Sequence, residues 1–145
     1  MSRFFISTVI FILFLASMPA RAADAQALDI LTKALTCNIK SGQTAAVIKA
    51  IKSLHAKPGK EDNTYILPDP IKIFGLNVNQ VVVLPDDGEG TDVYIAIFPN
   101  GNLKNIAAAA NLEPHGRDFS RDTKLGQLEA RAGNPTEVSL SCDLF

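Results

Sequence analysis

The chain has 145 residues, of which 47% are hydrophobic. This is enough for a single domain with one hydrophobic core, and no repeat, low-complexity segment or linker divides it. Fourteen basic side chains stand against fifteen acidic ones, a net charge of −1 at pH 7 that gives no support for nucleic-acid binding.

Residues 1–22 are typical of a secretory signal peptide. A short basic start precedes the apolar run Phe4–Leu15, and Ala20-Arg21-Ala22 places small residues where signal peptidase reads. A retained transmembrane anchor is the alternative, but the run is shorter than the roughly 20 apolar residues that span a bilayer. We therefore expect cleavage before Ala23, export to a bacterial periplasm or medium, and a mature single domain, residues 23–145, with no membrane contact.

Only two cysteines are present, Cys37 and Cys142. In an oxidising compartment an even count predicts a disulfide, which would tie the helical N-terminal region to the last strand. A redox or metal pair is the alternative, but neither cysteine lies in a C-x-x-C motif and no histidine neighbours either. A loop this long would contribute about 4 to 5 kcal/mol in the chain-entropy model.

Two helices are expected first. Ala25–Thr36 repeats leucine at helical spacing, and the next helix, capped by Ser41 or Thr44, has an apolar stripe and ends near His55 before Pro58-Gly59. The short connection between them predicts an αα-hairpin. The stripe of the second helix consists of Val47, Ile48, Ile51 and Leu54.

Strands follow. Tyr65–Leu67 suits a short edge strand, and Ile71–Val78 a strand with a bulge or tight turn at Gly75. Val81–Leu84 and Val93–Phe98 predict the central hairpin, because both are rich in β-branched and aromatic side chains. Apolar residues occupy nearly every position of both runs, so we expect both faces of this hairpin to be at least partly covered.

The last third is mixed. Leu103–Leu112 predicts a short helix, and residues 115–122 an irregular segment. Residues 123–132 fit either a helix or a strand, with polar alternation favouring the strand. Thr136–Asp143 alternates and places Cys142 on the core face. The expected fold class is α+β: an N-terminal helical hairpin packed on an antiparallel sheet of about four or five strands, with one short inserted helix.

This order of helix, helix and strands is similar to that of the small exported domains of the β-lactamase-inhibitor-protein kind. The stretch Lys40–Ile51, KSGQTAAVIKAI, also resembles the turn and helix that open such domains. The resemblance covers about a dozen residues and implies a likeness of fold.

Charge is unevenly distributed. Residues 23–60 have six lysines against two aspartates, whereas residues 61–100 have one lysine against seven carboxylates. Four of these carboxylates crowd the loop of the central hairpin, namely Asp86, Asp87, Glu89 and Asp92. The loop could bind calcium, enter a basic cleft of a partner protein, or act only as a solvated tip. The EF-hand spacing is absent, so we expect no metal or other cofactor.

Catalytic chemistry has weaker support. His115, Asp118 and Ser120 are residue types of an acid–base site, but no nucleophile motif or phosphate loop surrounds them. We therefore predict a non-enzymatic domain that binds or inhibits an envelope or secreted protein with a basic cleft, through the four loop carboxylates. The alternatives are a carrier of a small apolar ligand in the cell envelope and, less favoured, a small hydrolase.

Overall fold

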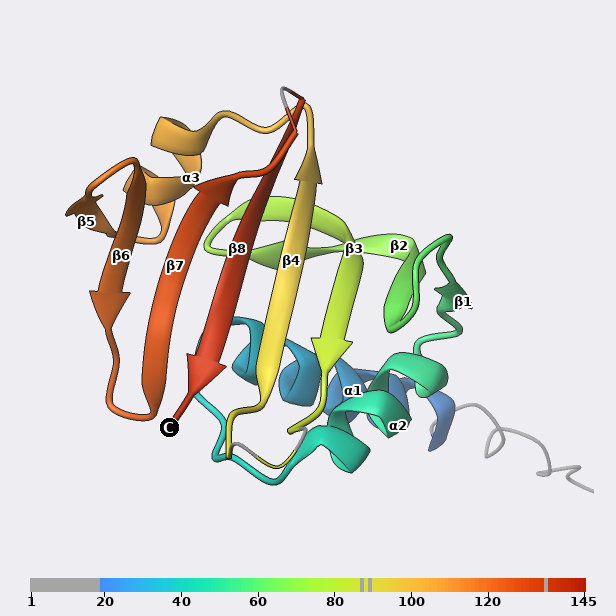
Figure 1. The fold of residues 1–145 in the computed structure, drawn as a ribbon. Helices are drawn as coiled ribbons and strands as arrows, with labels where there is room; N and C mark the ends of the chain where they lie inside the picture. Colours follow the sequence, from blue (N-terminus) through green and yellow to red (C-terminus); the bar gives the residue numbers. More distant parts are fainter. Residues whose placement is uncertain (1–18, 87, 89, 135) are drawn as a thin grey trace, which may run out of the picture.

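A computed structural model describes residues 19–86, 88, 90–134 and 136–145 (Figure 1). The helices are α1 Pro19–Leu35, α2 Thr44–Ser53 and α3 Leu103–Ala109. The strands are β1 Lys57–Pro58, β2 Thr64–Ile73, β3 Leu76–Leu84, β4 Val93–Pro99, β5 Glu113–His115, β6 Asp118–Asp122, β7 Gly126–Ala132 and β8 Glu137–Leu144. Most of the predicted signal peptide, residues 1–18, lies outside the described part, and residues 19–22 open α1.

One antiparallel sheet contains all eight strands, in the order β1-β2-β3-β4-β8-β7-β6-β5. The α+β class is confirmed, but the strand number and the helix arrangement differ from the prediction. Residues 115–122, expected to be irregular, contribute to the hairpin β5–β6, whose turn has Gly116 at φ +64. A two-residue loop that begins with glycine is a hairpin signal that the irregular assignment overlooked. Residues 126–132 form a strand, as the polar alternation favoured.

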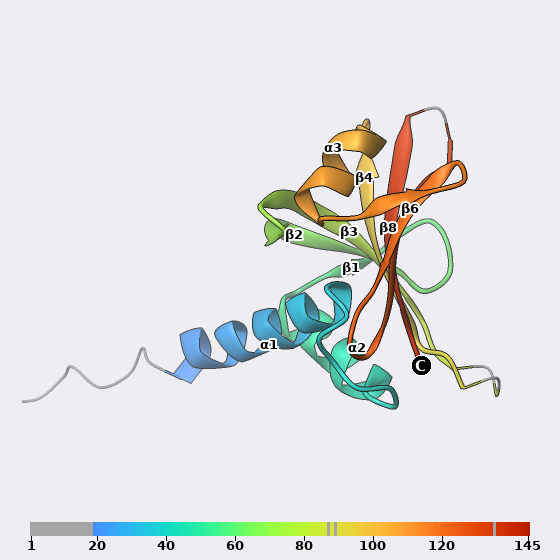
Figure 2. The same cartoon turned by 90° about the vertical axis from the view of Figure 1, so that its left-hand side faces the viewer.

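The sheet bends sharply in β2 and β3. The register between these strands shifts between Ile66 and Ile71, so the intervening residues bulge away from β3. Pro68 and Pro70 lie in this bulge. Proline has no N–H group, and at a bulge no hydrogen bond to the neighbouring strand is required from it. Beyond it the far half of the hairpin turns behind the sheet (Figures 1 and 2). The predicted short edge strand is therefore wrong: β2 has 10 residues and is bordered by β1.

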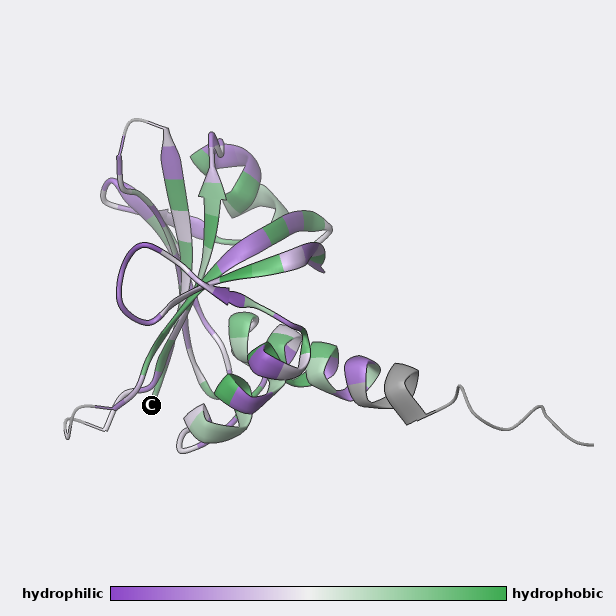
Figure 3. Cartoon of the chain, turned by 90° about the vertical axis from the view of Figure 1, so that its right-hand side faces the viewer, coloured by the Kyte–Doolittle hydropathy of each residue, from purple (hydrophilic) through white to green (hydrophobic). Residues whose placement is uncertain are grey.

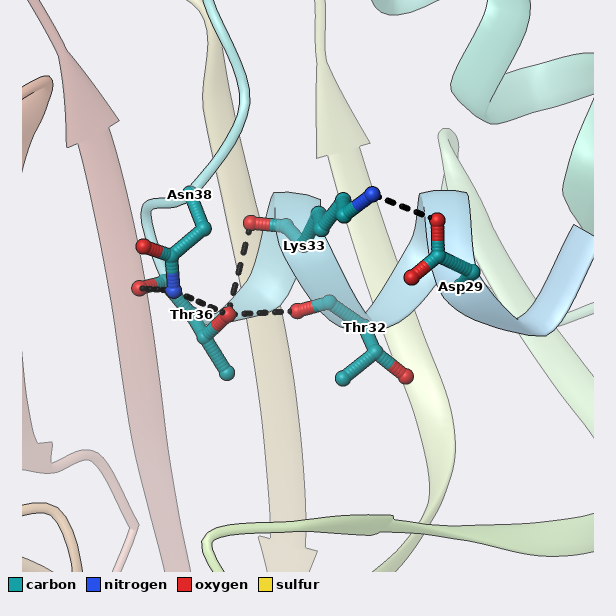
Figure 4. Close-up of polar contacts among 5 residues, drawn as sticks. All are labelled: Asp29, Thr32, Lys33, Thr36 and Asn38. Carbon is teal, nitrogen blue, oxygen red and sulfur yellow. Dashed lines mark hydrogen bonds and ion pairs between the residues drawn. The ribbon is translucent and has the colours of Figure 1, made fainter. Parts of the chain in front are cut away.

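All three helices lie on one side of the sheet, together with the bent β2–β3 tip (Figure 2). The layer that covers this side of the sheet thus contains α3 and the β2–β3 tip in addition to the expected helical hairpin of α1 and α2. Thr36 Oγ1 donates to Thr32 O at 2.7 Å near the end of α1, and Lys33 pairs with Asp29 (Figure 4). The N-cap of α2 is Gln43, which makes no side-chain cap bond, so neither Ser41 nor Thr44 caps the helix as predicted.

The core fills the space between the sheet and this cover. Leu31, Ile51, Tyr94 and Leu140 are each fully buried, with no exposed surface. Cys37, just after α1, forms the predicted disulfide with Cys142 of β8, with an S–S distance of 2.02 Å and a Cα–Cα distance of 5.4 Å. A disulfide suits a protein of an oxidising compartment, which is the environment expected for the exported chain. It also fixes α1 against the middle of the sheet.

Candidate functional site: the open face of the sheet

Among the residues that the structure describes, no helix lies on the face of the sheet opposite α1, α2 and α3, and we call this face the open face (Figures 1 and 2). Its residues follow from the register, because side chains alternate between faces along each strand. On β8 the core face carries Leu140 and Cys142, whereas Ser139, Ser141 and Asp143 point to the open face. An antiparallel sheet with one covered face usually presents polar residues on the other.

The central hairpin departs from that rule. Two cross-strand pairs, Val82 with Ile95 and Leu84 with Val93, place four apolar side chains side by side on the open face. We call these four residues the apolar strip. Leu84 is 39% exposed, and the other three are partly buried. Figure 3 shows hydrophobic residues along the strands that lead to the acidic loop. The expected cover is therefore present on the helix side of the hairpin, while the strip remains partly open.

The neighbouring strands make the other half of this face acidic. On the described residues of β6, β7 and β8, five carboxylates point to the open face beside a single cation, Arg131. Arg131 Nε donates to Asp118 at 3.0 Å, and its terminal NH2 group also binds Glu129. These bonds to carboxylates raise the pKa of Arg131. The five carboxylates are Asp118, Asp122, Glu129, Glu137 and Asp143.

Asp143 is the most unusual of these carboxylates. It lies opposite Val93 on one side and Gln127 on the other, next to the apolar strip. Its Oδ1 atom is buried and finds no hydrogen-bond donor in the described structure. Burial raises the pKa of Asp143 above its ordinary value of 3.8, and the charge of Glu129 raises it further. This environment therefore disfavours the ionised form of Asp143.

The acidic loop does not present its four carboxylates equally. Asp92 is 3% exposed, and its carboxylate accepts from Gly42 N at 2.6 Å and Thr44 Oγ1 at 2.7 Å. It also accepts from Asp86 N at 3.2 Å. Asp92 thus holds the start of α2 against the loop, a role that its position in a run of carboxylates did not reveal.

The other three carboxylates of the loop are placed differently. Asp86 is exposed, and its Oδ1 accepts from Gly88 N at 2.8 Å and from Gly90 N at 2.6 Å, which orders the turn. Asp87 and Glu89 lie outside the described residues. The loop joins Leu84 to Val93, so it borders the apolar strip directly.

A hollow of about 560 Å³ lies at the opposite end of the strip. The connection between β1 and β2 overhangs the open face there, and Ile66, Val82 and Ile97 contribute the apolar part of the lining. Pro58, Gly59 and six polar or charged residues complete it, namely Lys60, Glu61, Thr64, Gln80, Asn134 and Glu137. The open face therefore offers one continuous surface from this hollow, along the strip, to the acidic loop.

The residues of the hydrolase hypothesis lie on the hairpin β5–β6. His115 pairs with Asp118 across the turn, and Ser120 lies opposite Glu113. His115 is exposed, and Asp118 is bound by Arg131. Within the described part of the chain no hydrogen bond connects His115, Asp118 and Ser120.

Comparisons with known proteins add no family. No family model, no curated protein and no solved structure matches this chain. None of the helices in the described residues is long and apolar enough to cross a membrane. No group of three or more His, Cys, Asp or Glu side chains in the same residues is arranged to hold a metal ion.

Proposed function

We propose that this chain is a non-enzymatic binding module that recognises a basic protein of the cell envelope or the surrounding medium through its open face. The observation that carries the proposal is the apolar strip on a face that no helix of the described residues covers. Exposed apolar side chains rimmed by polar ones are a common mark of protein–protein interfaces. Val82, Leu84, Val93 and Ile95 would form the buried centre of such an interface.

The charges around the strip support a cationic partner. Five carboxylates on the open face of β6–β8 lie on one side of the strip, and Asp86 lies on the loop that borders its end, with Arg131 the one cation on the open face of the described β6–β8 residues. Asp143 is destabilised when ionised in the free protein, and a lysine or arginine of a partner would relieve that cost. The hollow beside Glu61 and Glu137 would accommodate the aliphatic stem and charged end of such a side chain.

Strand addition at the sheet edges has less support. The two edge strands, β1 and β5, have two and three residues, and each contains a proline, Pro58 or Pro114. Short edges with proline resist pairing with another strand. Binding through the broad face is therefore the mode that the geometry favours.

The test uses two leucines with nearly equal exposure. Leu84 in the strip is 39% exposed and Leu28 on α1, across the molecule, is 40% exposed. The purified protein, Leu84→Asn and Leu28→Asn serve as baits for envelope extract and spent medium, at low and moderate salt, with mass spectrometry as the readout. We expect one partner that is weakened by salt, lost with Leu84→Asn and retained with Leu28→Asn.

A second variant tests the acidic loop itself. Asp87→Asn combined with Glu89→Gln removes two charges and leaves Asp86 and Asp92, whose hydrogen bonds order the loop, in place. We expect weaker capture and a smaller salt dependence with an unchanged melting temperature. A partner that binds both leucine variants equally, or no partner under any condition, would contradict the proposal.

A further inference from the structure

A second hollow lies on the helix side of the molecule, between α1 and the bulge of β2. It is a groove of about 450 Å³. Leu28, Leu54, Leu67 and Ile71 line it, together with the two prolines of the bulge, Pro68 and Pro70. Leu67 and Ile71 are 2% and 7% exposed, so the floor is part of the core, whereas Leu28 is partly open to solvent.

The sequence explains why this groove stays open. Pro68 and Pro70 cannot donate to β3, and the residues between Ile66 and Ile71 leave the ladder. The bulge therefore departs from the regular pairing with β3, and the groove lies between it and α1. Proline also fixes the backbone of this wall, so the groove exists before any ligand binds.

The charges at the groove favour a ligand without charge. The charged residues of its lining are Asp24, Asp69 and Lys72, two acidic and one basic. All three are exposed, so they lie at the solvent rim and their mixed signs select neither anions nor cations. The buried floor, Leu67 and Ile71, is apolar and would impose a desolvation cost on any ionised group, and Thr32, half-buried, is the one uncharged polar side chain of the lining.

We propose that this groove binds a neutral, apolar small molecule about the size of two to three aromatic rings. An apolar cavity of ~150 Å³ holds one benzene molecule, and ligand pockets of about 300–1,000 Å³ are typical. The groove lies across the core from the open face, so the molecule would carry a ligand site independent of its protein-binding surface. The two sites share no lining residue.

Two dyes with the same ring skeleton test the charge and size requirements. N-phenyl-1-naphthylamine is neutral, whereas anilinonaphthalene sulfonate adds one sulfonate. We expect saturable fluorescence enhancement with the neutral dye at one site per chain. The sulfonate should bind at least about tenfold more weakly, because its charge would enter an apolar groove.

A matched pair of substitutions on α1 tests the location. Ala25→Phe places a ring in the groove, whereas Gln26→Phe adds the same ring at an exposed neighbour outside the lining. Ala25→Phe should weaken the neutral dye about tenfold or more, and Gln26→Phe should leave it unchanged. Leu28→Asn provides a second test if Ala25→Phe lowers the melting temperature.

Three results would overturn the assignment. They are dye binding that does not saturate, equal affinity for both dyes, or equal affinity of the wild type, Ala25→Phe and Leu28→Asn. Failure here would leave the open face untouched, because Leu28→Asn is expected to retain the protein partner while losing the dye.

Discussion

The ionised form of the Asp143 carboxyl group is less stable in the folded protein than in the unfolded chain. Burial raises the pKa of its carboxyl, and Glu129 on the adjacent strand raises it further. The native state therefore holds the proton more tightly than the unfolded state. Its contribution to stability is favourable in acid and is lost as the pH rises through the raised pKa.

We accordingly expect Asp143→Asn to raise the melting temperature at pH 7, with the gain shrinking toward zero near about pH 3, where the carboxyl is protonated in both states. Thermal unfolding followed across this pH range measures it. Glu137→Gln is the control, because it makes the same charge change on the same strand and face. A gain that is independent of pH would assign the effect to side-chain shape.

If the open face binds a basic protein, Asp143→Asn should also weaken capture of that protein.

At the scale of elements, the joint between α2 and the central hairpin depends on Asp92. This carboxylate accepts hydrogen bonds from the Gly42 amide in the turn before α2 and from the hydroxyl of Thr44, the first residue of α2, where the N-cap Gln43 makes no side-chain cap bond. The Tyr94 hydroxyl lies 3.2 Å from Thr44 Oγ1 and completes the group. A loop residue directly before β4 thereby satisfies donors at the start of a helix that the local sequence leaves without a side-chain cap.

Replacement of Asp92 by alanine should lower the free energy of unfolding by about 2 to 4 kcal/mol, because it removes a buried carboxylate that accepts hydrogen bonds from Gly42 N, Thr44 Oγ1 and Asp86 N. Urea unfolding measures the loss, and hydrogen exchange should show that the Gly42 amide loses protection. Asp122→Ala, at an exposed aspartate with one bond from Gln127, should cost less than about 1 kcal/mol. An equal loss of unfolding free energy in Asp92→Ala and Asp122→Ala would show that the hydrogen bonds of Asp92 do not stabilise the joint between α2 and the hairpin.

For the whole molecule, the Cys37–Cys142 disulfide joins the end of α1 to a central strand over a separation of 105 residues. In sequence β8 is the last strand, yet it lies between β4 and β7. The bond therefore closes nearly the entire domain and restricts the unfolded chain strongly.

We expect Cys37→Ala with Cys142→Ala to lose about 4 kcal/mol of stability, measured by urea unfolding without reductant. The wild type in excess reductant should approach the same midpoint. A loss below about 1 kcal/mol would mean that packing alone holds α1 on the sheet. Mass spectrometry of the unreduced, exported protein would show directly whether the bond forms in the cell.

The sequence alone determined the helices, the central hairpin, the last strand and the disulfide, because hydrophobic period and cysteine count are local signals. It also located the acidic loop. Tertiary structure decided which carboxylates of that loop are exposed to solvent. Asp92 is buried because Gly42 and Thr44, at the start of α2, pack against it and donate hydrogen bonds to it. The apolar strip could not be predicted, since alternation assigns residues to two faces without showing which face the helices cover. The groove likewise arises only when the two prolines of β2 bulge beneath a helix distant in sequence.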